Sequence, residues 1–487
     1  MLKSEQTIRP PIRYVNFDTR CRALCPLHGL AHNPDMKPRE LAEQICATLR
    51  AHGHQAYFVG GCVRDLELRR EPADYDVCTD ARPNRVQELF PNSVAVGAKF
   101  GVILVVEDST ASDERAQVEV ATFRSDIGYS DGRHPDQVAF SNTPQEDVLR
   151  RDFTINGLLM DPATREVLDF VGGREDLHAG IVRAIGEPQT RFTEDKLRML
   201  RAVRFAARFH FQIEPETMAA IQRLAPQITQ VSPERIRDEL TKLLTEGSAR
   251  LGFELLDQAG LLAVILPDIA RMKGVEQPPQ YHPEGDVWIH TRMLLEGLQP
   301  GCSPTLAWGA LLHDVGKPPT FTPAAGPGTR IRFDGHAEVG TGMAEHLCRA
   351  LRFSNDETEQ ITALVANHMR FKDAMQMRRS TLARFVRLPR FQEHLELNRL
   401  DCMASHRNLE TYNFVQRFLV ETPPEKVYPP RLVTGDDLKS MGLVPGPRFK
   451  QILLAVEEAQ LEGKLPDRES AIEFARSLTQ SESAAGD

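Results

Sequence analysis

Hydrophobic positions divide the chain into an α/β first part and a helical second part. Residues 38–52 have apolar residues at helical spacing, and the segment QAYFVGG after them predicts a short buried strand that ends in two glycines. The segments ADYDVCT, GVILVVED and AQVEVATF are short and rich in β-branched residues, which predicts further strands. From about Thr190 the apolar spacing becomes helical almost to the end. We therefore expect an α+β multidomain protein, with an α/β head containing a mixed sheet and all-α domains after it.

Two proline-rich breaks subdivide the helical part. EQPPQYHPEGD precedes a helical block that begins near Trp288, and ETPPEKVYPPRL precedes the final block. We interpret both breaks as domain edges. The expected organisation is a flexible extension over 1–36, the head over 37–180, a helical neck and body over 181–284, a third, all-α domain over 285–405 and a helical tail over 406–487.

Length and charge restrict the class of protein. A chain of 487 residues is too long for one hydrophobic core. It has no apolar run of the ~20 residues that a membrane span needs, and its start has no apolar signal segment, so we expect a cytoplasmic protein without membrane contact. The net charge of −9 excludes a uniformly basic nucleic-acid-binding surface. Any contact with RNA must therefore be local.

Three acidic residues in the strands of the head are candidate metal ligands. Asp74 and Asp76 lie two apart in a predicted strand, so both side chains project from the same face. Like charges held this close are costly without a cation, and Mg²⁺ prefers oxygen ligands. Glu119, between two valines of another strand, either faces solvent or converges with the aspartates. Three carboxylates with two metal ions would serve an in-line attack of a 3′-hydroxyl on a triphosphate.

A glycine turn before the aspartates is a candidate phosphate site. Gly60 and Gly61 follow a predicted strand and open a helix that carries Arg64, which would present backbone N–H groups to a phosphate. The alternative is an ordinary tight turn.

The predicted helix that starts near Glu194 has features of a base-selecting surface. It carries Arg198, Arg201 and Arg204 at three- and four-residue steps, which also fits a solvated arginine stripe. Asp195 and Arg198 would be neighbours on this helix, with an acceptor beside donors. Cytosine and adenine present an amino group next to an unprotonated ring nitrogen, so such a pair would favour them over uracil and guanine.

Histidines and aspartates of the second helical block are candidate ligands of a second metal. An apolar helix ends on an adjacent His-Asp pair, and further histidines and an aspartate lie on either side of it, a set that suits a divalent first-row metal. The set comprises His290, His313, Asp314 and Asp401, with His336 and His368 either completing a larger site or lying on the surface.

Five ordered motifs resemble those of a known family. GGCVRDLELRREPADYDVCTDA, QVEVATFR, DGRHPD, RRDFTINGL and EDKLRMLRAVRFAAR are similar, in order and spacing, to the motifs of the class II tRNA nucleotidyltransferases, the bacterial CCA-adding enzymes. The resemblance covers about residues 38–250. This chain has Arg69 where the family usually has glycine, and Lys196 where it usually has proline.

The resemblance implies roles for individual residues. Asp74 and Asp76 would hold Mg²⁺, and we extend that role to Glu119. The base-selecting motif corresponds to Glu194, Asp195 and Arg198, the triphosphate and ribose motif to Arg151, Asp152 and Asn156, and the loop that A-adding members use to change from C to A to Asp131, Gly132 and Arg133. The full set expected to bind nucleotide also includes Gly60, Gly61, Arg64, Arg124, Arg201 and Arg204.

The second helical block resembles the HD phosphohydrolase superfamily. This likeness implies a divalent transition metal on His290, His313, Asp314 and Asp401, with either phosphate-ester hydrolysis, on 2′,3′-cyclic or 2′-phosphate ends, or a purely structural module. The tail is similar to those of HD-bearing CCA enzymes, which implies that Arg448 and Lys450 of this chain touch RNA phosphates. The alternative is a plain helical packing role for the tail.

The expected function is the addition of C and/or A, from CTP and ATP, to the 3′ end of tRNA in the cytoplasm, without an obligate protein partner. Two alternatives stay open at this point. One is a poly(A) polymerase of the same superfamily, and the other is an HD phosphohydrolase whose head only senses nucleotides.

Overall fold

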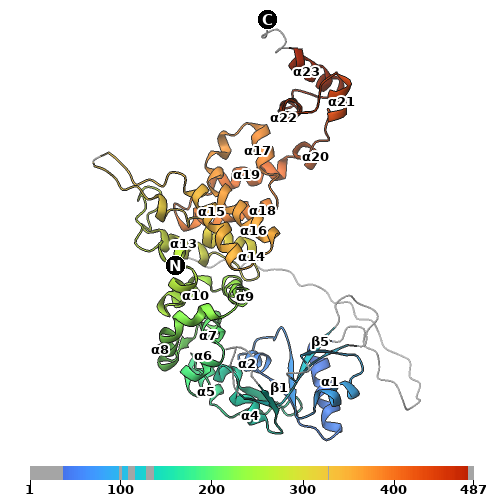
Figure 1. Cartoon of the computed structure of the whole chain (residues 1–487), viewed down its shortest axis with the longest axis vertical. Coiled ribbons are helices and arrows are strands. Elements are labelled where there is room, and N and C mark those ends of the chain that lie inside the picture. The colour runs from blue at the N-terminus through green and yellow to red at the C-terminus, as the bar shows by residue number, and fades with distance from the viewer. Residues whose placement is uncertain (1–36, 98–100, 108–115, 128–136, 327, 481–487) are drawn as a thin grey trace, which may run out of the picture.

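A computed structural model describes residues 37–97, 101–107, 116–127, 137–326 and 328–480 of the chain. Figure 1 shows an elongated molecule, with an α/β head at one end, helices through the middle and a small helical tail at the other end. The expected mixed-sheet head followed by helical domains is confirmed. None of the described helices is long and apolar enough to cross a membrane.

The head is built on a seven-stranded mixed sheet with the order β3-β4-β5-β2-β1-β8-β9. Strands β2 and β5 run parallel in its centre, and the other neighbouring pairs are antiparallel. The strands are β1 (Ala56–Val59), β2 (Asp76–Thr79), β3 (Ser93–Gly97), β4 (Val102–Val106), β5 (Gln117–Thr122), β8 (Leu158–Met160) and β9 (Val167–Asp169). Two smaller sheets pair β6 (Arg124–Ile127) with β7 (Gln137–Phe140) and β10 (Ile181–Val182) with β11 (Gln212–Ile213).

One face of the large sheet is covered by α1 (Pro38–Ala51), the helix expected from the apolar spacing. Its apolar stripe, including Ile45 and Leu49, is fully buried in the main core. The other helices of the head are α2 (Gly61–Glu67), α3 (Pro83–Leu89), α4 (Pro144–Leu149) and α5 (Gly173–Ala179). The alternation in β2 places Tyr75 and Val77 in the core, so Asp74 and Asp76 project from the opposite face.

A helical neck leads away from the head. Its long helix α7 packs against α9 and α10, and most of its residues are buried. The neck and body consist of α6 (Pro188–Glu194), α7 (Leu197–Phe209), α8 (Pro215–Leu224), α9 (Pro233–Thr245), α10 (Ala249–Gln258), α11 (Leu261–Ile265) and α12 (Pro267–Ala270).

The next helices surround α14 (Pro304–Leu312), which is buried along its whole length. Helix α14 packs on α9 of the neck, and Trp308 donates a hydrogen bond of 2.9 Å from Nε1 to Oγ1 of Thr241 there. Neck and third domain therefore share one continuous core. The helices of this part of the chain are α13 (Val287–Glu296), α15 (His336–Ala350), α16 (Asn355–Asn367), α17 (Arg379–Phe385) and α18 (Phe391–Ala404), with a 3-10 helix over His368–Gln376.

The tail has a small core of its own. Ile452 and Val456 of α22 are buried in it, and Gly463, with φ +74°, follows the end of that helix. The last helices are α19 (Glu410–Glu421), α20 (Pro424–Val427), α21 (Gly435–Ser440), α22 (Pro447–Leu461) and α23 (Arg468–Gln480).

Candidate active sites

The head carboxylates gather at the start of the central parallel strands. Asp76 begins β2, and Glu119 lies directly beside it on β5, as its partner in the parallel register. Asp74 precedes the strand and is exposed, as is Glu119. Glu119 is thus both solvent-facing and next to the aspartates, so the two interpretations of its position are compatible.

The pKa of Asp76 is shifted by this environment. Burial, together with the charges of Glu119 and Asp74, raises the pKa of Asp76 to about 6, although the nearby Arg151 guanidinium lowers it. Burial is the largest of these causes, and the two negative neighbours add to it. Acidic oxygens in this arrangement fit a divalent ion with oxygen preference.

Arg151 lies between the glycine turn and these carboxylates. Gly60 has φ +74°, and a Cβ atom built there would lie 3.2 Å from Nη1 of Arg151. The Arg151 guanidinium is held by Asp147, a fully buried carboxylate that also accepts hydrogen bonds from Arg150. The Gly60 turn, followed by Gly61 as the first residue of α2, therefore faces a fixed positive charge.

Arg64 has a different environment from the one expected for a phosphate ligand. Its guanidinium is buried, donates hydrogen bonds to Asp65 and Asn156, and stacks 4.6 Å from the centroid of the Phe209 ring. These contacts tie α2 to helix α7. The backbone of the glycine turn, rather than the Arg64 side chain, is thus the part of this motif that faces Arg151.

Asp152 joins the head to the neck. One carboxylate oxygen accepts the Asn156 amide at 3.1 Å, and the other accepts Nε and Nη2 of Arg201 from α7 at 2.8 and 2.6 Å. Burial opposes ionisation of Asp152, but Arg201 and Asn156 outweigh it and hold the pKa at about 2. Both partners stay charged near neutral pH.

The expected helix from Glu194 is wrong, because the chain breaks there. Helix α6 ends at Glu194, Asp195 is extended with φ −143° and ψ 106°, and α7 begins at Leu197. Asp195 therefore precedes α7, and its carbonyl accepts the backbone N–H of Arg198 at 3.1 Å, but the side chains of the two residues do not pair. Arg198 donates instead to Glu194 Oε2 at 2.7 Å, and Asp195 binds Arg235 of α9.

The remaining arginines of α7 bind acids of the neck rather than forming a solvated stripe. Arg204 is buried and donates to Glu239 at 2.7 Å, with Glu246 3.2 Å away. Arg208 also faces Glu246, at 3.7 Å. These pairs fix α7 against α9.

Six side chains meet in the third domain, and they come from the helices around α14. Asp314 is central, because its carboxylate lies 3.1 Å from Nε2 of His313 and 3.7 Å from Nε2 of both His336 and His368. Nε2 of His290 lies 3.1 Å from Oδ1 of Asp401. The expected residues, including the two that were left open, are thus brought together.

The imidazoles are oriented as metal ligands are. In His313, His336 and His368 the Nδ1 atom hydrogen-bonds a backbone carbonyl at 2.7–2.8 Å, which turns Nε2 towards the centre. Nε2 of His290 and Nε2 of His313 are buried, and each lies 3.1 Å from a carboxylate oxygen, of Asp401 and of Asp314, without the alignment of a hydrogen bond. Asp314 belongs to two groups of three possible ligands, one with His290 and His313 and the other with His336 and His368. Within each group the ligand atoms lie within 4.8 Å of one another. This donor set fits a divalent metal.

Comparison with known proteins supports one family over most of the chain. Family models match over 56–183 (Poly A polymerase head domain), 210–273 (probable RNA- and SrmB-binding site of polymerase A) and 285–397 (HD domain). The CCA-adding enzyme of Levilactobacillus brevis is 32% identical over 437 residues, which cover 89% of this chain and 96% of that protein. The chain belongs to the CCA-adding enzyme family.

Two further comparisons agree with this membership. The CCA-adding enzyme of Bacillus pumilus is 37% identical over 58% of this chain, and that alignment spans 64% of the relative's length. The crystal structure of the Bacillus stearothermophilus CCA-adding enzyme in complex with CTP matches 93% of this chain and 100% of its own, with a TM-score of 0.72 and 26% identity.

Both departures from the family motifs keep the backbone that the motif needs. Arg69, in place of the usual glycine, has φ +57°, the left-handed region that glycine adopts without strain. Lys196, in place of the usual proline, has φ −65°, the value to which a proline ring is fixed. The turns are therefore preserved although the residues differ.

Several residues of these sites were not expected from the sequence. Asp147 and Arg235 hold Arg151 and Asp195, while Glu284 accepts from Nδ1 of His290 at 2.7 Å and Lys317 contacts Asp314 at 2.6 Å. The contact of Lys317 could have been predicted from the sequence, because this residue lies one helical turn after the His-Asp pair. The others are acids and arginines without a distinctive spacing.

Some expected residues lie outside the described part of the chain. These are the extension over 1–36 and the loop residues Asp131, Gly132 and Arg133. Arg124 begins β6, whose partner β7 resumes at Gln137 on the far side of that loop.

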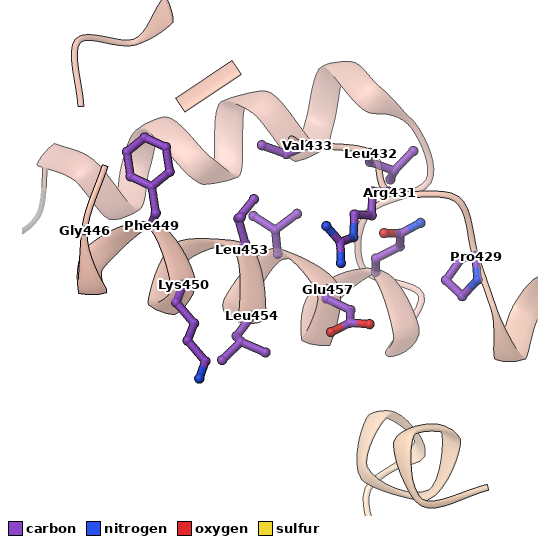
Figure 2. Close-up of a pocket in the computed structure, with 12 residues that line it drawn as sticks. Pro429, Arg431, Leu432, Val433, Gly446, Phe449, Lys450, Leu453, Leu454 and Glu457 are labelled. Carbon is purple, nitrogen blue, oxygen red and sulfur yellow. The ribbon is translucent and has the colours of Figure 1, made fainter. Parts of the chain in front are cut away.

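A groove on the tail lies between α22 and the preceding segment 429–433. Figure 2 shows Phe449, Leu453 and Leu454 of α22 along it, with Arg431 across from Glu457. Lys450 lines the groove and is exposed, whereas Arg448 donates to the carbonyl of Thr479.

Gly316→Ala should damage the HD centre through the backbone. A Cβ atom at Gly316 would lie 2.1 Å from the carbonyl oxygen of His336 and 2.6 Å from the nitrogen of Gly340, so the start of α15 must move. We expect at least a roughly tenfold loss of metal affinity, measured by calorimetric titration with Mn²⁺. Gly342→Ala, on the same helix with nothing within 4 Å, should leave the affinity unchanged. Equal affinities of the two variants would contradict this assignment.

Asp76→Asn should stabilise the metal-free protein at high pH. Because the folded-state pKa of about 6 exceeds the ordinary 3.8, the folded state loses stability as pH rises through about 6, by at most about 3 kcal/mol. The melting temperature with chelator should therefore exceed that of the wild type at pH 8 and equal it below pH 4. Asp334→Asn, at an exposed position, serves as the control. A lower melting temperature for Asp76→Asn at pH 8 would refute the crowding of these carboxylates.

Proposed function

We propose that this protein is a tRNA nucleotidyltransferase that adds C and A, from CTP and ATP, to the 3′ end of tRNA. The observation that carries the proposal is the pairing of Asp76 with Glu119 beside Arg151 and the Gly60 turn. Sequence similarity to a CCA-adding enzyme over 96% of that relative supports it.

Asp74, Asp76 and Glu119 would hold divalent ions, which we propose to be Mg²⁺ because all three offer only carboxylate oxygens. Bound there, such ions would activate the 3′-hydroxyl of the RNA and neutralise the triphosphate from which pyrophosphate leaves. The raised pKa of Asp76, to about 6, supports this arrangement, because a bound cation would favour the ionised carboxylate that burial and the charges of Glu119 and Asp74 disfavour.

The protein's own groups would bind and orient the nucleotide. Arg151, fixed by Asp147, presents positive charge to the triphosphate next to the backbone N–H groups of Gly60 and Gly61. Asp152 and Asn156 would contact the ribose, with Arg201 holding the Asp152 carboxylate in place. Asp195 and Arg198 would select the base at the α6–α7 break. Arg235 holds the side chain of Asp195, and Glu194 holds that of Arg198.

The RNA partner would contact the helical part of the molecule. We propose that the neck and body over 181–284 and the tail over 406–487 bind tRNA; the head over 37–180 precedes them in the chain, and the HD domain over 285–405 lies between them. Lys450 is exposed on the tail groove, where it can meet a phosphate, and Arg448 is already bound to a carbonyl. Maturation of tRNA would place the enzyme in the cytoplasm.

An extension assay tests the proposal. Purified protein is incubated with three tRNA substrates, one that lacks the whole 3′ CCA, one that ends in the first C and one that ends in CC. CTP and ATP are supplied separately and together. We expect growth that stops at CCA, and its loss in Asp74→Ala, by at least about a thousandfold, because a carboxylate ligand is removed.

Two results would contradict that expectation. Continued addition of A beyond one residue would indicate a poly(A) polymerase, and nucleotide binding without extension would indicate a sensing head. The control is Asp334→Asn, an exposed substitution that should extend tRNA like the wild type.

We also propose that the HD domain hydrolyses phosphate esters with a divalent transition metal. The buried Nε2 atoms of His290 and His313, each 3.1 Å from a carboxylate oxygen, support this. Those two residues would hold the metal with Asp314 and Asp401, and His336 and His368 would complete a second set around Asp314. Lys317, 2.6 Å from Asp314, would orient that carboxylate.

The two activities should separate by mutation. Asp314→Ala should abolish hydrolysis of a 2′,3′-cyclic phosphate on an RNA end and spare C and A addition, since it removes the shared ligand of the HD centre. Asp74→Ala should do the reverse. Product analysis after addition of Mn²⁺, Co²⁺ or Ni²⁺ measures both. Absence of hydrolysis by the wild type with every metal would show that the HD domain is structural.

A further inference from the structure

Asp195 is held by an arginine from a different part of the neck. Oδ1 of Asp195 accepts Nη1 of Arg235 at 3.2 Å, and Oδ2 accepts Nη2 at 2.8 Å, a two-pronged contact. Arg235 lies in the first turn of α9, whereas Asp195 lies in the extended break between α6 and α7. The pair is partly buried, with 23% and 17% of the side chains exposed, so solvent screens it only in part.

A second, separate pair lies beside it. Arg198 donates through Nη1 to Glu194 Oε2 at 2.7 Å and to the Arg191 carbonyl at 3.1 Å, and through Nη2 to the Arg150 carbonyl at 3.1 Å. The side chains of Asp195 and Arg198 are therefore held by different partners. Their backbones are linked at the start of α7, where the Asp195 carbonyl accepts the backbone N–H of Arg198 at 3.1 Å.

The hydrogen bonds of Asp195 leave a definite acceptor position. A carboxylate offers about four lone-pair positions. Oδ1 uses two of them, for the backbone N–H of Leu197 at 3.0 Å and for Arg235, and Oδ2 uses one for Arg235. One position on Oδ2 is left, enough for a single N–H. An exocyclic amino group of cytosine or adenine fits it, and the carbonyl of uracil or guanine would be repelled.

Arg198 has complementary donors. Three of its five N–H groups are used by the contacts above, which leaves Nε and one N–H on Nη2. An unprotonated ring nitrogen next to an amino group can accept one of them. Rotation of the Asp195 carboxylate would misalign the two contacts, because a planar guanidinium fixes the plane of the carboxylate that it binds.

We propose that Arg235 is a positioning residue for base selection, which orients Asp195 to accept the amino group of an incoming C or A. This inference rests on the proposed nucleotidyltransferase function and adds a residue from α9 to its specificity. Arg235 would not touch the base, since both of its terminal nitrogens are directed to Asp195. Its removal should let the carboxylate turn and reduce discrimination against U and G.

The test compares kcat/KM for single addition of each of the four nucleotides to tRNA that lacks its 3′ CCA. In Arg235→Gln the ratio of CTP to UTP should fall by about tenfold or more, the scale of one mispaired polar group. Arg235→Lys should recover part of the ratio, since it keeps the charge but not the two-pronged contact. Arg271→Gln, an exposed arginine in the same region, is the matched control.

A double variant separates positioning from folding. Arg235→Gln should have no further effect on the ratio in an Asp195→Ala background, because the residue would act only through Asp195. Equal loss of rate for all four nucleotides, with the ratio preserved in both Arg235→Gln and Arg235→Lys, would overturn the inference and leave a structural ion pair. If the wild type adds neither C nor A, the proposed function itself fails. Should Arg235→Gln not fold, the same ratio in Arg235→Lys decides the outcome.

Discussion

Electrostatic repulsion at the start of strands β2 and β5 is the constraint on which the head depends. The parallel register fixes Asp76 beside Glu119, and Asp74 lies two residues away on the same face. A sheet would avoid this arrangement for stability alone, because like charges held together raise each other's pKa. The fold tolerates it since the backbone pairing of β2 and β5 and the core behind them, including Tyr75 and Val77, hold the strands in place.

Arginine–carboxylate pairs stabilise the region in which the head meets the helical neck. Asp147 holds Arg151, Asp152 holds Arg201 of α7, and Asp195 holds Arg235 of α9. Asp147 and Arg151 lie only four residues apart, whereas the other two pairs join segments that are distant in sequence. In each pair the guanidinium fork imposes an orientation as well as an attraction. The nucleotide site that we propose would thus be a joint between two domains, in which the head supplies the carboxylates and the neck supplies the base-selecting groups.

The sequence was sufficient to predict features that depend on local periodicity. It was not sufficient to predict side-chain contacts between segments that are distant in sequence. The two-residue spacing was enough to place Asp74 and Asp76 on one face, whereas the position of Glu119 was left open until the parallel register showed it beside Asp76. The His-Asp pair at the end of α14 indicated the HD centre. The break at Asp195 was missed, because 194–208 has unbroken helical spacing and no glycine or proline marks the interruption. The role of Arg235 was missed for a different reason, since nothing local distinguishes a partner 40 residues away.

Proton release on metal binding tests the central claim most directly. In a protein carrying Asp314→Ala, to disable the HD centre, calorimetric titration with Mg²⁺ near pH 6 is repeated in buffers of different ionisation enthalpy. If the head carboxylates hold the ion, binding should release up to one proton from Asp76, and Asp76→Asn should abolish that release and weaken the binding. Unchanged affinity and unchanged proton release in Asp76→Asn would place the ion elsewhere and contradict the account.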